Sequence, residues 1–189
     1  FREAPGPGLL SVVAGDGARA VGGAAVELIL DASGSMLQRM EGKRRIVVAR
    51  EVLTEAVREH IPAGTPLALR VFGHKEADAC RTDLEIPLAP LDPAAAAAKI
   101  AGIQAMNLAR TPIADSLAAI AGDLKGAGGR AAVVLVTDGE ETCEGDPAAV
   151  IEALRKKGID VNLNIVGFAI GDAELEAQFE SWADLGDGR

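Results

Sequence analysis

The chain has few aromatic residues and contains no tyrosine. Phe, Trp and Tyr together make up 3% of its 189 residues, which argues against an aromatic stacking platform for single-stranded nucleic acid. Acidic residues outnumber basic ones and give a net charge of −9, so a surface for a phosphate backbone is not expected either. No apolar run approaches the roughly 20 residues of a membrane span. We therefore expect neither nucleic-acid binding nor membrane insertion.

Cysteine is also scarce. The two cysteines, Cys80 and Cys143, are too few for a disulfide scaffold and form no CxxC pair for zinc or redox chemistry. From the residues alone they are either two free thiols or one disulfide. Hydrophobic residues nevertheless make up 49% of the chain, which is enough for one folded domain with its own core.

The beginning of the chain differs from the rest in composition. Residues 1–23 are rich in Gly, Ala and Pro and predict a linker or a short hairpin around Asp16-Gly17. The domain itself is expected over residues 24–189. The chain starts with "FREAPGPGLL" and shows no signal-peptide pattern. We expect it to be a piece of a longer protein or a processed form.

Strand and helix patterns alternate along residues 24–189. Strands are predicted over 24–31, 66–73, 130–139 and 159–171, and a short edge strand, limited by Pro87, over 83–91. Helices are predicted over 42–61, 92–103, 111–124, 146–158 and 172–186. This alternation indicates a doubly wound α/β domain with a mostly parallel sheet and helices on both faces.

Three of the predicted helices begin alike, with a capping residue followed by proline at the first helical position. The pairs are Asp92-Pro93, Thr111-Pro112 and Asp146-Pro147. In open α/β sheets the ligand site lies beyond the carboxyl ends of the strands. The loops at that edge are therefore the first place to look for functional side chains.

Five oxygen-bearing residues are expected to meet at that edge. Asp31 follows one apolar strand and Asp138 another, while Ser33 and Ser35 follow Asp31 directly and Thr111 precedes a helix. Without thiolate or imidazole, this set suits Mg²⁺, Mn²⁺ or Ca²⁺, with Mg²⁺ favoured, and suits zinc poorly. Taken singly, the hydroxyl residues are more often helix caps, and the Asp138-Gly turn is more often only a turn.

The order of these residues resembles that of the von Willebrand factor type A domains. The family's metal ion-dependent adhesion site has the pattern DxSxS, a distant threonine and a distant aspartate, which this chain fills with Asp31-Ala32-Ser33-Gly34-Ser35, Thr111 and Asp138. The resemblance covers residues 24–185. It implies that the serines and the threonine hold the ion most directly. The two aspartates would act largely through water.

The resemblance also implies a role and a compartment. The ion would be completed by an Asp or Glu carboxylate of a protein partner, which makes the domain a metal-dependent interaction or adhesion module and not an enzyme. Similar bacterial proteins have cysteines in the same two loops, which implies a Cys80–Cys143 disulfide and an extracytoplasmic location: periplasmic, secreted or cell surface. The family's last strand and helix would lie after Gly186.

Two other functions stay open. One is an intracellular metal-dependent docking module for an ATPase or chelatase assembly. The other is a metal-dependent hydrolase with Asp31 as nucleophile, although Ser33 stands where such enzymes usually carry a second acid. No P-loop or GxSxG motif is present. Glu140, beside Asp138, is either an outer-shell residue of the ion or part of a solvated acidic loop.

Overall fold

The computed structural model describes residues 25–168 and 173–188. The linker or hairpin predicted over residues 1–23 lies outside the described residues. Within them, the chain folds around one five-stranded sheet with the strand order β5-β4-β1-β6-β7. The strands are β1 (Val26–Asp31), β4 (Pro66–Phe72), β5 (Thr82–Pro90), β6 (Ala131–Thr137) and β7 (Val161–Gly167).

The sheet is mostly parallel, as the alternating pattern predicts. Strand β1 lies at its centre and pairs in parallel with both β4 and β6, while β7 pairs in parallel with β6. Among the five described strands of this sheet, only β5, at one edge, runs antiparallel. The carboxyl ends of β1 and β6, which carry Asp31 and lead into Asp138, therefore lie next to each other.

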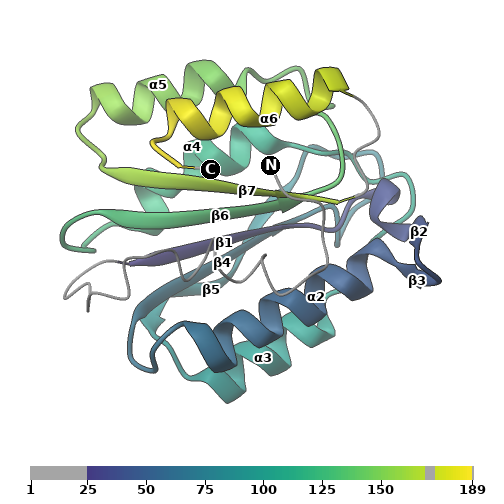
Figure 1. Ribbon diagram of the computed structural model, residues 1–189, viewed down its shortest axis with the longest axis horizontal. Helices are drawn as coiled ribbons and strands as arrows, with labels where there is room; N and C mark the ends of the chain where they lie inside the picture. The colour runs from purple at the N-terminus through teal and green to yellow at the C-terminus, as the bar shows by residue number, and fades with distance from the viewer. Residues whose placement is uncertain (1–24, 169–172, 189) are drawn as a thin grey trace.

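Helices cover both faces of the sheet (Figure 1). Two of them, α2 (Arg45–Glu55) and α3 (Pro93–Gly102), lie on one face; α2 continues into a π-helical turn, η2 (Ala56–His60). On the opposite face lie α4 (Ile113–Asp123), α5 (Pro147–Lys156) and α6 (Ala173–Leu185). This arrangement confirms the predicted doubly wound α/β fold. Within the described ranges, no helix combines the length and the apolar character needed to cross a bilayer.

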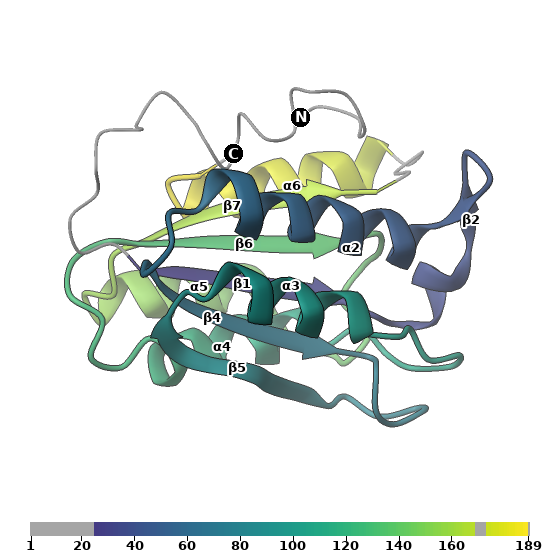
Figure 2. The same cartoon turned by 90° about the horizontal axis from the view of Figure 1, so that it is seen from below.

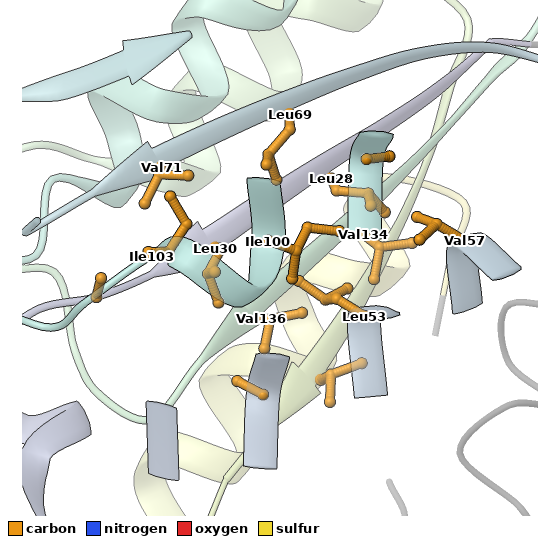
Figure 3. Packing of buried hydrophobic residues seen from close by; sticks show 14 of the residues in the cluster. Leu28, Leu30, Leu53, Val57, Leu69, Val71, Ile100, Ile103, Val134 and Val136 are labelled. Atoms are coloured by element: carbon orange, nitrogen blue, oxygen red, sulfur yellow. The ribbon is translucent and has the colours of Figure 1, made fainter. Parts of the chain in front are cut away.

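Each face of the sheet has its own hydrophobic core because side chains alternate along a strand. Leu28 and Leu30 of β1 pack toward α2 and α3, in the cluster drawn in Figure 3. Ile29, between them, packs with Ile113 and Leu117 on the α4 side. Burial on both faces explains why β1 and β6 have continuous apolar sequences.

The edge strand β5 has the predicted length. It spans nine residues, Thr82–Pro90, and so begins and ends one residue earlier than the predicted range 83–91. Leu67 pairs with Ala89 and Leu69 with Ile86, so two residues of β5, one of them Pro87, stand opposite one residue of β4. This β-bulge on an edge strand accommodates proline, which has no N–H to donate to a neighbour.

A small hairpin that the sequence pattern does not predict precedes the first helix. Strands β2 (Arg39–Met40) and β3 (Lys43–Arg44) pair antiparallel around Glu41 and Gly42, which both have positive φ angles. Positive φ at both central positions is typical of two-residue hairpin turns. Helix α2 consequently begins at Arg45 and not at residue 42. The hairpin projects beyond the end of the sheet at which the parallel strands finish (Figure 2).

Candidate functional site

Asp31 lies at the end of β1, where its carboxylate is fully buried. Its Oδ1 accepts a hydrogen bond from the backbone N–H of Ser33 (2.7 Å), and its Oδ2 accepts one from the Thr137 hydroxyl (2.6 Å). Thr137 is the last residue of β6. Both oxygens of Asp31 are thus held by the protein, which fixes the loop after β1 against the end of β6.

The two serines and the second aspartate form a chain of hydrogen bonds. The hydroxyl oxygens of Ser33 and Ser35 lie 3.0 Å apart, and the Ser35 hydroxyl donates to Asp138 Oδ1 at 2.6 Å. Ser35 belongs to a short 3₁₀ turn, η1 (Gly34–Leu37), which starts directly after Ser33. Four of the five predicted residues, Asp31, Ser33, Ser35 and Asp138, therefore meet at the carboxyl edge of the sheet.

Thr111 reaches the same region through its backbone. It is buried, and its N–H donates to the Thr142 hydroxyl at 2.7 Å while its carbonyl accepts from the N–H of Thr142 at 3.2 Å. Two residues earlier, the carbonyl of Ala109 accepts from the N–H of Gly34 at 3.2 Å. These bonds place the Thr111 segment against the loop that carries the two serines.

Thr111 does not cap α4, which corrects the sequence-based expectation for this helix. Pro112 occupies the N-cap position, and no N-cap side chain accepts a bond from the helix. The N–H of Ala114 instead donates to Glu141 Oε2 at 2.7 Å. A distant carboxylate therefore takes the place of the local cap, which leaves the Thr111 hydroxyl without a capping role.

The two glutamates in the loop after β6 have different environments. Glu141 accepts from Ala114 and also, through Oε1, from the N–H of Cys143 at 2.6 Å. Glu140 is exposed. It lines a cavity of about 480 Å³ together with Glu141, Asp146 and Trp182. Glu141, whose role the sequence did not reveal, thus organises the loop that follows Asp138.

Cys80 and Cys143 form the disulfide that the resemblance implies. Cys80 lies in the loop between β4 and β5, and Cys143 in the loop between β6 and α5. Asp78, in the first of these loops, donates its N–H to the carbonyl of Leu108 at 2.9 Å. The disulfide therefore joins two loops that both contact the segment from Leu108 to Thr111.

Arg45 is a further site residue that sequence reasoning missed. Its Nη1 donates to Asp138 Oδ2 at 2.7 Å, and the side chains are 14% and 0% exposed, respectively. Arg45 is the first residue of α2, where a positive charge interacts unfavourably with the helix dipole. A cation at a helix start was the available signal that a tertiary partner lies nearby.

The electrostatics of the site favour a positive charge. Burial, and then the negative charge of Asp138, raise the pKa of the Asp31 carboxyl to about 6, although hydrogen bonds from Ser33 and Thr137 act in the opposite direction. Two buried carboxylates in one site repel each other unless a cation compensates them. Hydroxyl and carboxylate oxygens are the ligands of hard divalent ions.

The donor set at this edge fits such an ion. Among the described residues, no group of three or more His, Cys, Asp or Glu side chains is placed to hold a metal. A cation at this site would therefore depend on the hydroxyls of Ser33, Ser35 and Thr111, which are neutral. Neutral ligands leave more positive charge on the ion than an all-carboxylate set, and an anionic ligand is then the natural completion.

The fold is that of the von Willebrand factor type A domains. Among solved structures, an aerotolerance-related membrane protein from Bacteroides fragilis matches with a TM-score of 0.68 and 22% identity, over 88% of this chain and 89% of that one. A von Willebrand factor type A protein from Catenulispora acidiphila matches with a TM-score of 0.58 and 18% identity, over 86% and 43%. Proximal thread matrix protein 1 of the mussel byssus, with a zinc-occupied adhesion-site motif, matches with a TM-score of 0.65 and 22% identity, over 81% and 37%.

Proteins with similar sequences show which family the chain belongs to. The chain is 37% identical over 153 residues to YwmD of Bacillus subtilis (strain 168), an uncharacterized protein, covering 76% of this chain and 67% of YwmD. YwmC of the same strain, also uncharacterized, is 29% identical over 178 residues, covering 86% and 74%. No family model matches the chain. The chain belongs to the same family as YwmD.

Proposed function

We propose that the protein is a metal-dependent protein-binding module. Ser33, Ser35 and Thr111 would hold a divalent cation, with Mg²⁺ favoured, and Asp31 and Asp138 would support it through water or hydrogen bonds. An Asp or Glu side chain of a partner protein would complete the coordination. The observation that carries this proposal is the continuous chain of hydroxyl and carboxylate groups from Ser33 to Asp138.

The burial of the two aspartates supports binding over hydrolysis. Asp31 is fully buried, and both of its oxygens already accept hydrogen bonds from the protein. A carboxylate held in this way is poorly placed to attack a substrate as a nucleophile. Asp138, with a side chain that is 0% exposed, is occupied by Ser35 and Arg45.

Calorimetric titration with Mg²⁺ and Mn²⁺ tests the metal site. The protein is expected to bind a divalent ion, and Ser33→Ala and Thr111→Ala are each expected to abolish binding while circular dichroism shows an intact fold. Ser181→Ala, an exposed serine on α6, is the matched control and should bind as the unchanged protein does. Undiminished binding in both site variants would refute the site.

We also propose that the protein works outside the cytoplasm. The Cys80–Cys143 disulfide supports this location, because structural disulfides persist in oxidising compartments and are rare in the cytosol of mesophiles. The similarity in fold to a membrane protein of Bacteroides fragilis is in agreement. Thiols can be titrated in protein that is isolated from its host, alkylated at once and then unfolded without reductant. Two free thiols per chain would contradict the proposal and favour the intracellular docking module.

A further inference from the structure

Arg45 sits in an unfavourable local position. It is the first residue of α2, whose N-cap residue, Arg44, makes no side-chain cap. Its positive charge opposes the helix dipole there. Its Nε is buried and has no hydrogen-bond partner among the described residues. Local structure therefore gives no reason for a partly buried guanidinium at this point.

The partner that compensates Arg45 is Asp138. The guanidinium donates a hydrogen bond to Oδ2 of this carboxylate at 2.7 Å, and the Ser35 hydroxyl donates one to Oδ1 at 2.6 Å. Asp138 has no exposed side-chain surface, so without Arg45 it would be a buried charge whose one remaining partner within the described ranges is the Ser35 hydroxyl. Such an uncompensated charge is strongly destabilising. Arg45 thus supplies the positive charge that the site requires in this structure.

A divalent ion at the two serines would come close to the same carboxylate. The ion and the guanidinium would then share one negative charge, and they would repel each other in a site that is largely buried. The free energy of ion binding would therefore include the cost of separating Arg45 from Asp138. The tighter this pair, the weaker the apparent affinity for the ion.

We propose that Arg45 is a built-in counter-ion that competes with the divalent cation for Asp138. It stabilises the metal-free protein and lowers the apparent affinity for the ion, and the Arg45–Asp138 pair separates when the ion binds. This inference rests on the proposed metal site. It assigns to Arg45 the role of an affinity-setting residue at that site.

The experiment compares Arg45→Met with the unchanged protein. Methionine keeps an unbranched apolar side chain but carries no charge. The metal-free variant is expected to melt at a lower temperature, because Asp138 loses its counter-ion. It is also expected to bind Mn²⁺ about tenfold more tightly in calorimetry, which corresponds to about 1.4 kcal/mol. Saturating Mn²⁺ should therefore raise its melting temperature more than that of the unchanged protein.

Two further variants keep the outcome interpretable. Arg44→Met removes the same charge from an exposed neighbour and should change neither affinity nor melting temperature appreciably. Arg45→Lys keeps the charge but not the planar fork that suits carboxylates, so its affinity should lie between those of the methionine variant and the unchanged protein. If Arg45→Met does not fold without metal, folding rescued by Mn²⁺ supports the proposal.

The results that overturn the inference differ from those that overturn the metal site. Equal or weaker Mn²⁺ binding by Arg45→Met, with clear binding by the unchanged protein, refutes competition but leaves the proposed function intact. Absence of Mn²⁺ binding in both proteins refutes the site and the inference together. Binding by Arg45→Met alone would support the inference in its strongest form.

Discussion

The Cys80–Cys143 disulfide makes a quantitative prediction about stability. The two cysteines are 63 residues apart in sequence. In the chain-entropy model, closing a loop of this length restricts the unfolded chain and stabilises the folded state by about 4 kcal/mol. For a domain of this size, each kcal/mol corresponds to about 2–4 °C in melting temperature. We therefore expect the Cys80→Ser/Cys143→Ser double variant to melt about 8–16 °C lower.

The folded structure should survive the loss of the disulfide because other bonds hold both loops. Cys143 donates its N–H to Glu141, and Asp78 donates its N–H to Leu108 while accepting from Arg110 Nε at 2.8 Å. The loss of stability should thus arise mainly from the greater freedom of the unfolded chain. A less restricted unfolded chain exposes more surface, so the dependence of unfolding free energy on urea should become steeper.

Urea unfolding followed by circular dichroism provides the assay. The oxidised protein, the reduced protein and the double-serine variant are compared, and the last two should agree with each other. A loss below about 1 kcal/mol with an unchanged urea dependence would refute the chain-entropy reasoning. A double variant without native secondary structure would show instead that the disulfide is required by the folded loops themselves.

Two further predictions concern buried groups away from the disulfide. Burial, and then neighbouring Asp123, raise the pKa of fully buried Glu27 to about 9. The contribution of protonated Glu27 to the stability of the fold is therefore complete below pH 4.5 and is lost as the pH rises toward 9. Glu27→Gln should match the unchanged protein near pH 4 and exceed its unfolding free energy by on the order of 3 kcal/mol at pH 7, and equal stabilities across this range would contradict the assignment. Gly73 has φ +74°, and a Cβ there would lie 2.5 Å from the backbone nitrogen of Ser33, whereas Gly64, with φ +82°, has open space. Gly64→Ala should lower the free energy of unfolding in urea by about 1–2 kcal/mol and leave Mn²⁺ binding intact. Gly73→Ala should lower the free energy of unfolding by more and should also weaken Mn²⁺ binding. Equal effects of the two variants would show that the contact with Ser33 is unimportant.

Much of the fold could be predicted from the residue pattern because its signals are local. The apolar runs of β1 and β6 reflect burial on both faces of the sheet. Asp92 and Asp146 accept bonds from the first backbone N–H groups of α3 and α5, as their place before proline indicates. Gly158 has the positive φ angle expected of a residue just after a helix.

Two features that the residue pattern did not predict depend on distant partners. The bulge that accommodates Pro87 in β5 depends on the pairing of this strand with β4. The start of α4 depends on Glu141, which replaces the expected cap Thr111. Glu141 accepts a hydrogen bond from the N–H of Ala114, which lies 27 residues earlier in the chain. Local propensity cannot report such contacts, since nothing near these residues in sequence distinguishes them from ordinary loop residues.

The candidate site shows the same division most clearly. The sequence by itself determined the oxygen-rich loop from Asp31 to Ser35, because these residues are neighbours and their turn is local. Only the tertiary structure decided how the loop is held and what neutralises it. Thr137 reaches Asp31 across 106 residues, and Arg45 reaches Asp138 across 93. Hydrogen bonds and charges act through space, so the sheet had to bring these strand ends together before either partner could be recognised.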